Sequence, residues 1–281
     1  MSVKIITDST SDIRYDEVEK LGIKVVPLNV SFGDETYKDS VDITVEDFYK
    51  KLKTSQYFPK TSQPAPELFV KIFNEAKEKG DDVIYIAISS GLSGTIGSAN
   101  LAKSIVDYDK IHIIDSLSSI QGLRLLVHHA CKMRDLGYSA HDIISQIEDM
   151  KKRIKIFSMI DTLEYLYKGG RLSKAKCIFG NAVGLKPLID LDEKGKIRMY
   201  GKVIGINRAY KAILDSFSKH PFDPEYPIYF GYTDTPINLN VLINKIESKY
   251  NLPGKDISQI GPTIGSHIGH GGFCVIYVEK K

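Results

Sequence analysis

VIYIAISSGLSGTIGSA, residues 83 to 99, shows an abrupt change of pattern within one short segment. Val83–Ile88 is a continuous apolar run, typical of a strand buried on both faces in a parallel sheet that is covered by helices. Small hydroxylated residues and glycines follow, and helical spacing starts at about Thr95. The segment predicts a strand, a loop and a helix, which is the unit of an α/β fold.

The loop between this strand and helix is a candidate anion site. Ser89, Ser90, Ser93 and Thr95 offer hydroxyl groups, and the first helical turn adds unpaired N–H groups and the positive end of its dipole. A carboxylate or a phosphate would suit such a loop, and so would simple helix capping. The loop lacks the second glycine of a G-x-S-x-G nucleophile elbow. No likely strand is followed by a Walker loop or a dinucleotide fingerprint, so we predict no ATP site.

The composition is that of an ordinary folded protein. The 281 residues, with 42% hydrophobic and 26% charged residues, are enough for two domains that each bury a core. The net charge of +3 is spread along the chain, so we expect no nucleic-acid binding. We see neither a signal peptide nor a membrane-spanning run, and we expect a cytoplasmic protein. The scattered cysteines Cys131, Cys177 and Cys274 are predicted to be buried, reduced thiols.

Strands and helices alternate through the first half of the chain, as in a parallel sheet. Thr7, Asp8, Ser9 and Thr10 end the first strand, at the sheet edge where such folds bind ligands. The prolines of TSQPAP, residues 61–66, exclude a central strand, so we expect Thr61 and Ser62 on a rigid loop, as a second anion contact or as simple loop caps. We predict strands at 3–7, 23–30, 83–88 and 111–115, and helices at 13–21, 44–53, 66–79, 95 onward, 120–136 and 140–153.

The pattern changes near residue 155, where we predict that a second, smaller domain begins. We therefore divide the chain into a parallel-sheet α/β domain, 1–154, and a mixed-sheet α/β domain, 155–281. Turn residues between two β-prone runs indicate an antiparallel hairpin, and Gly169, Gly170 and Arg171 form a tight turn. The predicted strands are 154–160, 187–191, 196–203, 228–232 and 273–279, and the predicted helices are 163–168, 207–218 and 237–250.

Histidines are candidate metal ligands, but their settings do not favour that role. The glycine-rich segment GPTIGSHIGHGG, residues 261–272, is predicted to present His267 and His270 on a loop. Its glycines argue against a helix that could seat a metal on both imidazoles, and no thiol or acidic partner lies nearby in sequence. We interpret His128, His129 and His141 as surface or packing residues on helices. We therefore predict no metal site.

Six short motifs, taken together, resemble those of the DegV family. Each motif is weak alone, but their order and spacing span nearly the whole chain. The motifs are TDSTSD (7–12), TSQPAP (61–66), SSGLSGT (89–95), YLYKGGRLS (165–173), GLKP (184–187) and IGPTIGSHIG (260–269). The resemblance implies a two-domain α/β protein that holds one long-chain fatty acid between its domains. It also implies a separate ATP-dependent kinase subunit, which phosphorylates the bound carboxylate to an acyl-phosphate for phospholipid synthesis.

The resemblance also implies which residues of this chain would contact the fatty acid. It places the fatty acid carboxylate against the hydroxyls of Thr61, Ser62 and Ser93, with Arg171 and His267 near the same head group and assisting phosphoryl transfer. The chain would be a lipid-binding subunit without a cofactor of its own, and transient contact with a membrane surface is compatible with that role.

The chain departs from the family pattern at two places. His270 stands where a proline is common, and the segment DSLSSIQG, from Asp115, lacks the usual repeated glycines, so we expect a differently shaped turn and pocket rim.

Two other functions stay open at this point. One is a small serine hydrolase or esterase in which Ser93 is the nucleophile and His267 the base. The other is a carrier of a different small anion, such as a phosphate ester, because anion loops alone do not distinguish a carboxylate from a phosphate.

Overall fold

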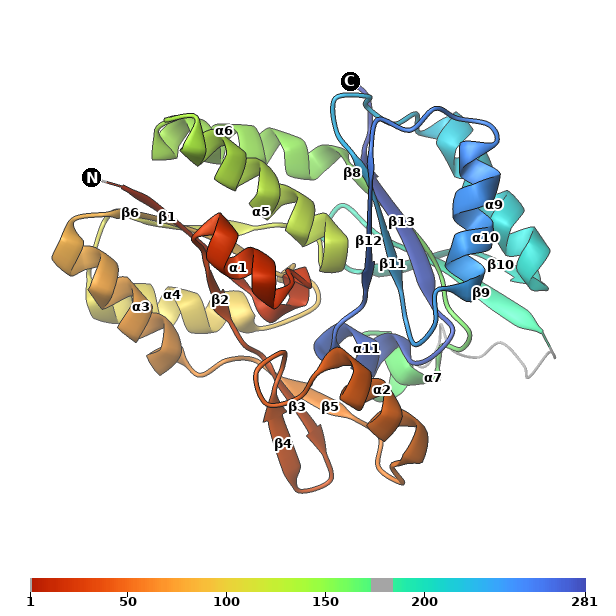
Figure 1. Cartoon of the computed structure of the whole chain (residues 1–281). Coiled ribbons are helices and arrows are strands. Elements are labelled where there is room, and N and C mark those ends of the chain that lie inside the picture. The colour runs from red at the N-terminus through yellow and green to blue at the C-terminus, as the bar shows by residue number, and fades with distance from the viewer. Residues whose placement is uncertain (1, 173–183) are drawn as a thin grey trace.

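The computed structural model describes residues 2–172 and 184–281, and Figure 1 shows two sheets side by side with helices around them. The central segment is as predicted: β6 (Asp82–Ala87) is followed by a loop and by α4 (Thr95–Val106). Side chains from Val83 to Ala87 are fully buried, because helices cover both faces of this strand. Cys177 and Ser173 lie outside the described residues.

The first sheet is parallel, has four strands and follows the order β2-β1-β6-β7. Helices α3 and α4 pack on one face, where Phe69 and Phe73 of α3 meet Tyr85 of β6. Helices α1, α5 and α6 pack on the other face, which confirms the predicted parallel sheet flanked by helices. The other elements here are β1 (Val3–Asp8), η1 (Ser9–Ser11), α1 (Tyr15–Leu21), β2 (Lys24–Val26), α3 (Pro66–Lys79), β7 (Ile111–Asp115), α5 (Ile120–Asp135), α6 (Ala140–Met150) and η2 (Lys151–Arg153).

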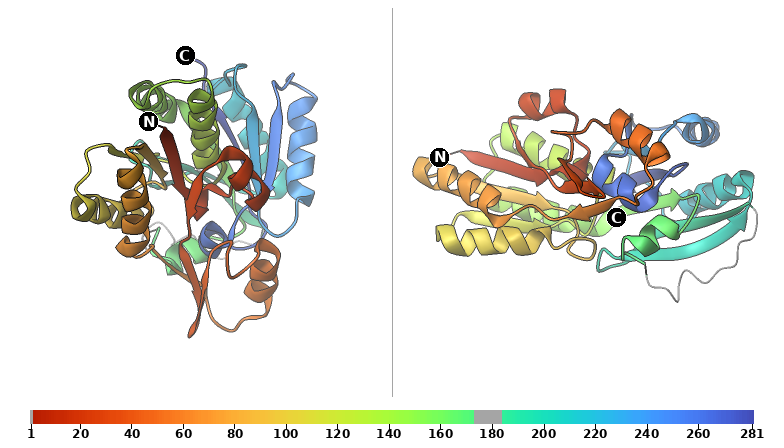
Figure 2. Two further views of the ribbon diagram at one scale, coloured as in Figure 1. Left: turned by 60° about the vertical axis from the view of Figure 1, so that its left-hand side comes forward. Right: turned by 90° about the horizontal axis from the view of Figure 1, so that it is seen from below.

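The second sheet is mixed, has six strands and follows the order β10-β9-β8-β13-β11-β12. Only β11 and β12 pair in parallel, and the predicted hairpin of β9 and β10 is antiparallel. Helices α9 and α10 cover the face away from α5 (Figures 1 and 2). The elements are β8 (Ile154–Met159), β9 (Leu185–Leu191), β10 (Ile197–Ile204), α9 (Ile206–Lys219), β11 (Ile228–Tyr232), α10 (Ile237–Glu247), β12 (Lys255–Gln259) and β13 (Phe273–Val278). The second sheet starts close to residue 155, and the division into domains 1–154 and 155–281 stays a prediction.

A third, three-stranded sheet corrects two predictions. The single strand expected at 23–30 is two strands in different sheets, because Pro27 lacks the N–H needed to continue the ladder. The expected loop at Thr61 begins with a short edge strand, and its prolines follow that strand. This sheet has the order β4-β3-β5 and packs with α2. Its elements are β3 (Asn29–Phe32), β4 (Glu35–Lys38), α2 (Val45–Thr54) and β5 (Lys60–Ser62).

Three further differences concern single elements. The helix expected from Ile13 starts at Tyr15, because the 3-10 turn η1 and a left-handed Asp12, with φ 51°, precede it. Strand β12 was not predicted, since its sequence KDISQ is mostly polar at the edge of the sheet. The expected histidine loop contains a helix, α11 (Pro262–Ile268).

Two properties bear on cysteine chemistry and membranes. Cys131 and Cys274 are free and buried, as predicted, and burial raises the pKa of the Cys131 thiol to about 11. Among the residues that the structure describes, no helix has the length and apolar character to cross a bilayer.

Candidate functional site

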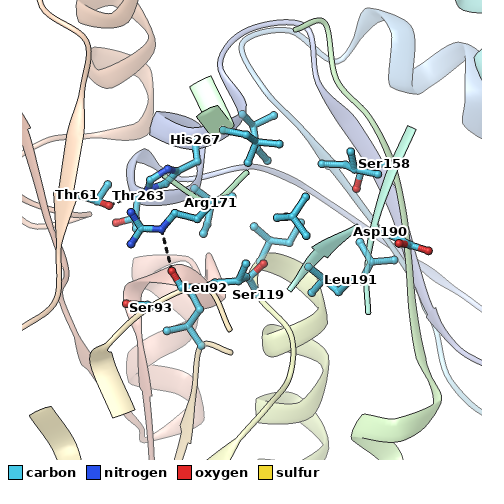
Figure 3. Close-up of a pocket in the computed structure, with 18 of the residues that line it drawn as sticks. Thr61, Leu92, Ser93, Ser119, Ser158, Arg171, Asp190, Leu191, Thr263 and His267 are labelled. Atoms are coloured by element: carbon cyan, nitrogen blue, oxygen red, sulfur yellow. Dashed lines mark hydrogen bonds between the residues drawn. The ribbon is translucent and has the colours of Figure 1, made fainter. Parts of the chain in front are cut away.

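An apolar cavity lies between the first and second sheets and has a polar cluster at one end (Figure 3). It encloses about 690 Å³ of space free of protein atoms, its open mouth included. Aliphatic side chains form most of the wall: Leu28, Ile88, Leu92, Ile120, Ile156, Leu166, Ile189, Leu191, Ile197, Ile264 and Ile268. The polar lining residues are Thr61, Ser93, Ser119, Ser158, Arg171, Asp190, Thr263 and His267.

Thr61 and His267 form the centre of the polar end. Thr61 is on β5 and His267 is at the end of α11, yet Thr61 Oγ1 lies 2.8 Å from His267 Nε2. Thr61 faces the cavity, whereas its neighbour Ser62 is exposed and does not line it. This follows from strand geometry, because successive side chains point to opposite faces. The structure therefore brings Thr61, but not Ser62, to the predicted head-group site.

Helix α11 corrects the predicted loop. Pro262 starts the helix, a position that needs no N–H, and Gly269 ends it with φ 74°. Gly265, inside the helix, lies against the rings of Phe48 and Tyr49, so its lack of a side chain serves close packing and not flexibility. The glycines that argued against a helix thus allow this one to dock.

His267 is deeply buried, with 8% of its surface exposed. Burial, with a smaller effect of the nearby Arg171 cation, lowers the pKa of His267 to about 4. The imidazole is therefore neutral at pH 7. Its Nδ1 has no hydrogen-bond partner in the described part of the chain and approaches the backbone of Gly169. A neutral imidazole can donate a hydrogen bond to a carboxylate without adding a second buried charge.

Arg171 follows α7 (Glu164–Lys168) and is held by two carbonyl groups. Its Nε donates to the Leu92 carbonyl at 3.0 Å, and Nη1 donates to the Gly169 carbonyl at 2.6 Å. Burial lowers the pKa of its guanidinium, and no described carboxylate lies within ion-pair distance. Arg171 thus links the turn after α7 to the loop before α4. Its cation is left without a carboxylate partner in the described residues at the polar end of the cavity.

Ser93 is the only hydroxyl of the predicted anion loop that lines the cavity. Its Oγ lies 2.8 Å from Thr95 Oγ1, at the start of α4. Ser89 instead donates to the Gly195 carbonyl at 2.9 Å, and Ser90 bonds to Asp115. All four hydroxyls thus have a hydrogen-bond partner within the protein, and one of them, Ser93, also lines the cavity.

The end of β1, where we expected a ligand contact, does not line the cavity and instead supports the loop that does. Asp8 is fully buried and accepts hydrogen bonds from Tyr85 Oη at 3.0 Å and from the Ile88 N–H at 2.8 Å. Burial raises the pKa of this carboxyl, and these donors oppose the shift. Asp8 therefore holds the end of β6, from which the Ser93 loop starts.

Four polar residues of the wall were not predicted as site residues: Ser119, Ser158, Asp190 and Thr263. Thr263 lies within the glycine-rich motif but donates to the buried Asp39. Asp190 forms a two-contact ion pair with Arg198, at 2.8 and 2.6 Å. Ser119 belongs to the DSLSSIQG segment, where Leu117 and Ile120 have φ of 53° and 47°. Such angles are uncommon for non-glycine residues, so glycines at these positions would have been easier to accommodate.

The site lacks two features that other chemistries need. Ser93 and His267 bond to Thr95 and Thr61 and not to each other, so the nucleophile and base of a serine hydrolase are not paired. The described residues contain no group of three or more His, Cys, Asp or Glu that could hold a metal. His270 lies apart from the cavity and approaches Asp234 at 3.6 Å.

The fold and the cavity define a class of α/β protein in which an apolar chamber with one polar end lies between two sheets. Comparison with known proteins identifies the family. A family model described as "Uncharacterised protein, DegV family" matches residues 2–280. The chain belongs to the DegV family.

Relatives and solved structures match over almost the full length. A DegV domain-containing protein of Caldanaerobacter subterraneus is 35% identical over 99% of both chains. DegV of Bacillus subtilis, described as a fatty acid binding protein, is 30% identical, with a TM-score of 0.86 over 100% of both chains. A DegV family protein of Thermus thermophilus, described by its fatty acid binding, is 29% identical, with a TM-score of 0.89 over 100% of both chains.

Proposed function

We propose that this protein binds one long-chain fatty acid in the cavity and presents its carboxylate to a separate kinase. The observation that carries the proposal is an apolar chamber whose one polar end holds Thr61, Ser93, Arg171 and His267. Fatty acid binding by the Bacillus and Thermus relatives supports the same ligand class for this chain.

The balance of apolar and polar groups favours a lipid over a small phosphate ester. Burial of a methylene stabilises a complex by about 0.8 kcal/mol, so about fifteen carbons contribute on the order of 10 kcal/mol before ordering costs. A few hydroxyl contacts contribute roughly 1 kcal/mol each. The hydrocarbon tail would therefore supply most of the affinity, and the polar end would set the orientation.

The polar end suits a carboxylate that stays ionised. The hydroxyls of Thr61 and Ser93, the neutral imidazole of His267 and the cation of Arg171, which has no carboxylate partner among the described residues, would stabilise the anionic form. An ionised carboxylate is the nucleophile needed to attack the γ-phosphorus of ATP, with ADP as the leaving group and an acyl-phosphate as product. Because the chain has no ATP motif, we assign ATP to a partner subunit, and the proposed setting is the cytoplasm, with acyl-phosphate supplied to phospholipid synthesis.

The first prediction tests ligand and orientation together. We expect organic extracts of the purified protein to contain one fatty acid per chain by mass spectrometry. Thr61→Val and Ser93→Ala should lose this ligand about two- to tenfold faster, because each removes one hydrogen bond of roughly 0.5 to 1.5 kcal/mol. Ser62→Ala, on the adjacent exposed side chain, is the matched control and should retain it. A phosphate ester or no ligand in the extract would contradict the proposal.

A further inference from the structure

Ser158 interrupts an apolar row on β8. Side chains alternate along this strand: Phe157 and Met159 pack in the core beneath α9 and α10, while Ile154 and Ile156 face α5. Ser158 is on the same face as Ile156, and both line the cavity. A hydroxyl therefore stands at a position where the strand pattern calls for an aliphatic side chain.

The Ser158 hydroxyl has no hydrogen-bond partner among the residues that the structure describes. The residue is 7% exposed, and its side chain forms no hydrogen bond with any residue that the structure describes. Ser119, across the cavity at the start of α5, is also 7% exposed, and its side chain does not cap the helix. Both hydroxyls line the chamber, so each is available to a molecule inside it.

These hydroxyls are not part of the head-group cluster. Figure 3 shows Ser158 at the opposite end of the drawn residues from Thr61, with Ser119 between them. Ser158 pairs in register with Ile189, and the aliphatic side chains of Ile156, Ile189 and Leu191 line the cavity around it. Ser158 therefore faces the part of the chamber that would hold hydrocarbon and not the carboxylate.

A plain alkyl chain would satisfy neither hydroxyl. Covering a polar group with methylenes removes water from it without returning a hydrogen bond, which is unfavourable. An oxygen atom on the chain would restore that bond, because a serine hydroxyl can both donate and accept. The wall thus suits a chain that is apolar except at its carboxylate and at one more point.

We propose that the preferred ligand is an oxygenated long-chain fatty acid, hydroxy or oxo, whose chain oxygen hydrogen-bonds to Ser158. This inference rests on the proposed fatty acid binding and narrows its substrate class. Ser119 offers the corresponding contact to an oxygen nearer the head group. Eleven aliphatic side chains still line the cavity, so an acid with a single oxygenated carbon keeps nearly all of the hydrophobic contribution.

The test compares acids that differ only in the chain oxygen. Delipidated full-length protein is titrated with octadecanoic acid, with a positional series of hydroxyoctadecanoic and oxooctadecanoic acids, and with a cis-unsaturated acid of the same length. We expect at least one oxygenated isomer to bind about three- to tenfold more tightly than octadecanoic acid. Ser158→Ala should abolish that preference and leave octadecanoic acid bound at least as tightly. Ser93→Ala should weaken all the acids by a similar factor.

The outcomes separate this inference from the proposed function. Binding of octadecanoic or cis-unsaturated acid as tightly as every oxygenated isomer would overturn the oxygenated class and leave fatty acid binding in place. If Ser158→Ala still prefers an oxygenated acid to octadecanoic acid, the hydrogen bond assigned to Ser158 is wrong. If none of the acids binds, both proposals fail.

Discussion

At the scale of single residues, Arg171 has two separable roles. Its guanidinium joins the Leu92 and Gly169 carbonyls, and it is a cation at the polar end of the cavity. Because the hydrocarbon tail of the proposed ligand would supply most of the affinity, we expect Arg171→Ala to retain fatty acid nearly as well as the parent. Acyl-phosphate formation with the cognate kinase should fall by an order of magnitude or more, as for other arginines that steady a transferred phosphoryl group.

Three measurements on Arg171→Ala distinguish the roles: fatty acid content, melting temperature and phosphorylation rate. Arg171→Lys is the control, since it keeps the positive charge but cannot reproduce both carbonyl contacts. A lower melting temperature with a normal phosphorylation rate would show that Arg171 is a structural bridge only. That result would contradict the phosphoryl-transfer assignment.

His267 predicts a pH dependence of folding stability. Its pKa is lowered to about 4 in the folded, ligand-free protein, against about 6.5 when unfolded. Between these values the unfolded chain binds a proton that the folded chain does not, so the free energy of unfolding falls as pH drops from about 6.5 to 4. The full loss is about 3 kcal/mol for this group.

Urea unfolding of delipidated protein across pH 4 to 7 measures this effect. His267→Gln removes the titration and keeps a polar side chain near Thr61, so its stability should depend less steeply on pH than that of the parent. His128 and His129 also have pKa values lowered by burial, and they are present in both proteins. Parallel curves for the two proteins would show that His267 does not titrate in this way.

At the scale of elements, the docking of α11 sets the position of His267. A Cβ at Gly265 would lie 2.7 Å from Phe48 Cε1 and 2.8 Å from Tyr49 Oη, within a well-packed contact. We expect Gly265→Ala to destabilise the protein by about 1 to 3 kcal/mol, because overpacking displaces one of these elements. The Thr61 to His267 hydrogen bond should be disturbed as well, which would speed ligand loss.

Gly97 provides the matched control for this prediction. It is also inside a helix, α4, but a Cβ there meets nothing within 4 Å. Gly97→Ala should therefore be neutral or stabilising by up to about 1 kcal/mol, since alanine is the better helix former. Chemical denaturation of both variants checks the pair. Equal stabilities would mean that α11 can shift without cost.

At the scale of the whole molecule, the hairpin turn between β9 and β10 joins the two main sheets. Gly195, in this turn, lies against the loop that carries Ser93: a Cβ would be 2.0 Å from Ser89 Oγ and 2.9 Å from Leu117 Cα. The Gly195 carbonyl also accepts the Ser89 hydrogen bond. This contact lies beside the cavity, whose lining includes Leu92 and Ser93 of the loop and Leu191 and Ile197 of the two strands that the turn connects.

We expect Gly195→Ala to separate the turn from the loop and to release fatty acid faster, measured as transfer to an acceptor in solution. Gly22→Ala is the control: Gly22 has a similar positive φ, 59° against 65°, but no atom lies within 4 Å of its Cβ position. Both substitutions strain the backbone by about 1 to 2 kcal/mol. Only Gly195→Ala should speed the release of fatty acid. Equal release rates for the two variants would contradict a role for the contact between Gly195 and Ser89.

Local signals in the sequence were sufficient for the central elements. The buried run before Ser89 and the spacing of the parallel units predicted β6 and the first sheet, because hydrophobic periodicity acts over a few residues. The order of six motifs also predicted the family, which the family model confirms. Thr61, Ser93, Arg171 and His267 were named from that resemblance, and the structure brings all four to one cavity.

Tertiary structure alone decided the rest. The α11 helix exists because Gly265 can pack against Phe48 and Tyr49, which are more than two hundred positions earlier in the chain. The exclusion of Ser62 depends on the pairing of β5 with β3, which sets the face to which each side chain points. Nothing in the sequence around Ser158 marked it as a site residue, and only the position of β8 in the fold shows that it lines the cavity. Local patterns specify elements, whereas the cavity is formed by contacts between segments far apart in sequence, and no short-range pattern encodes them.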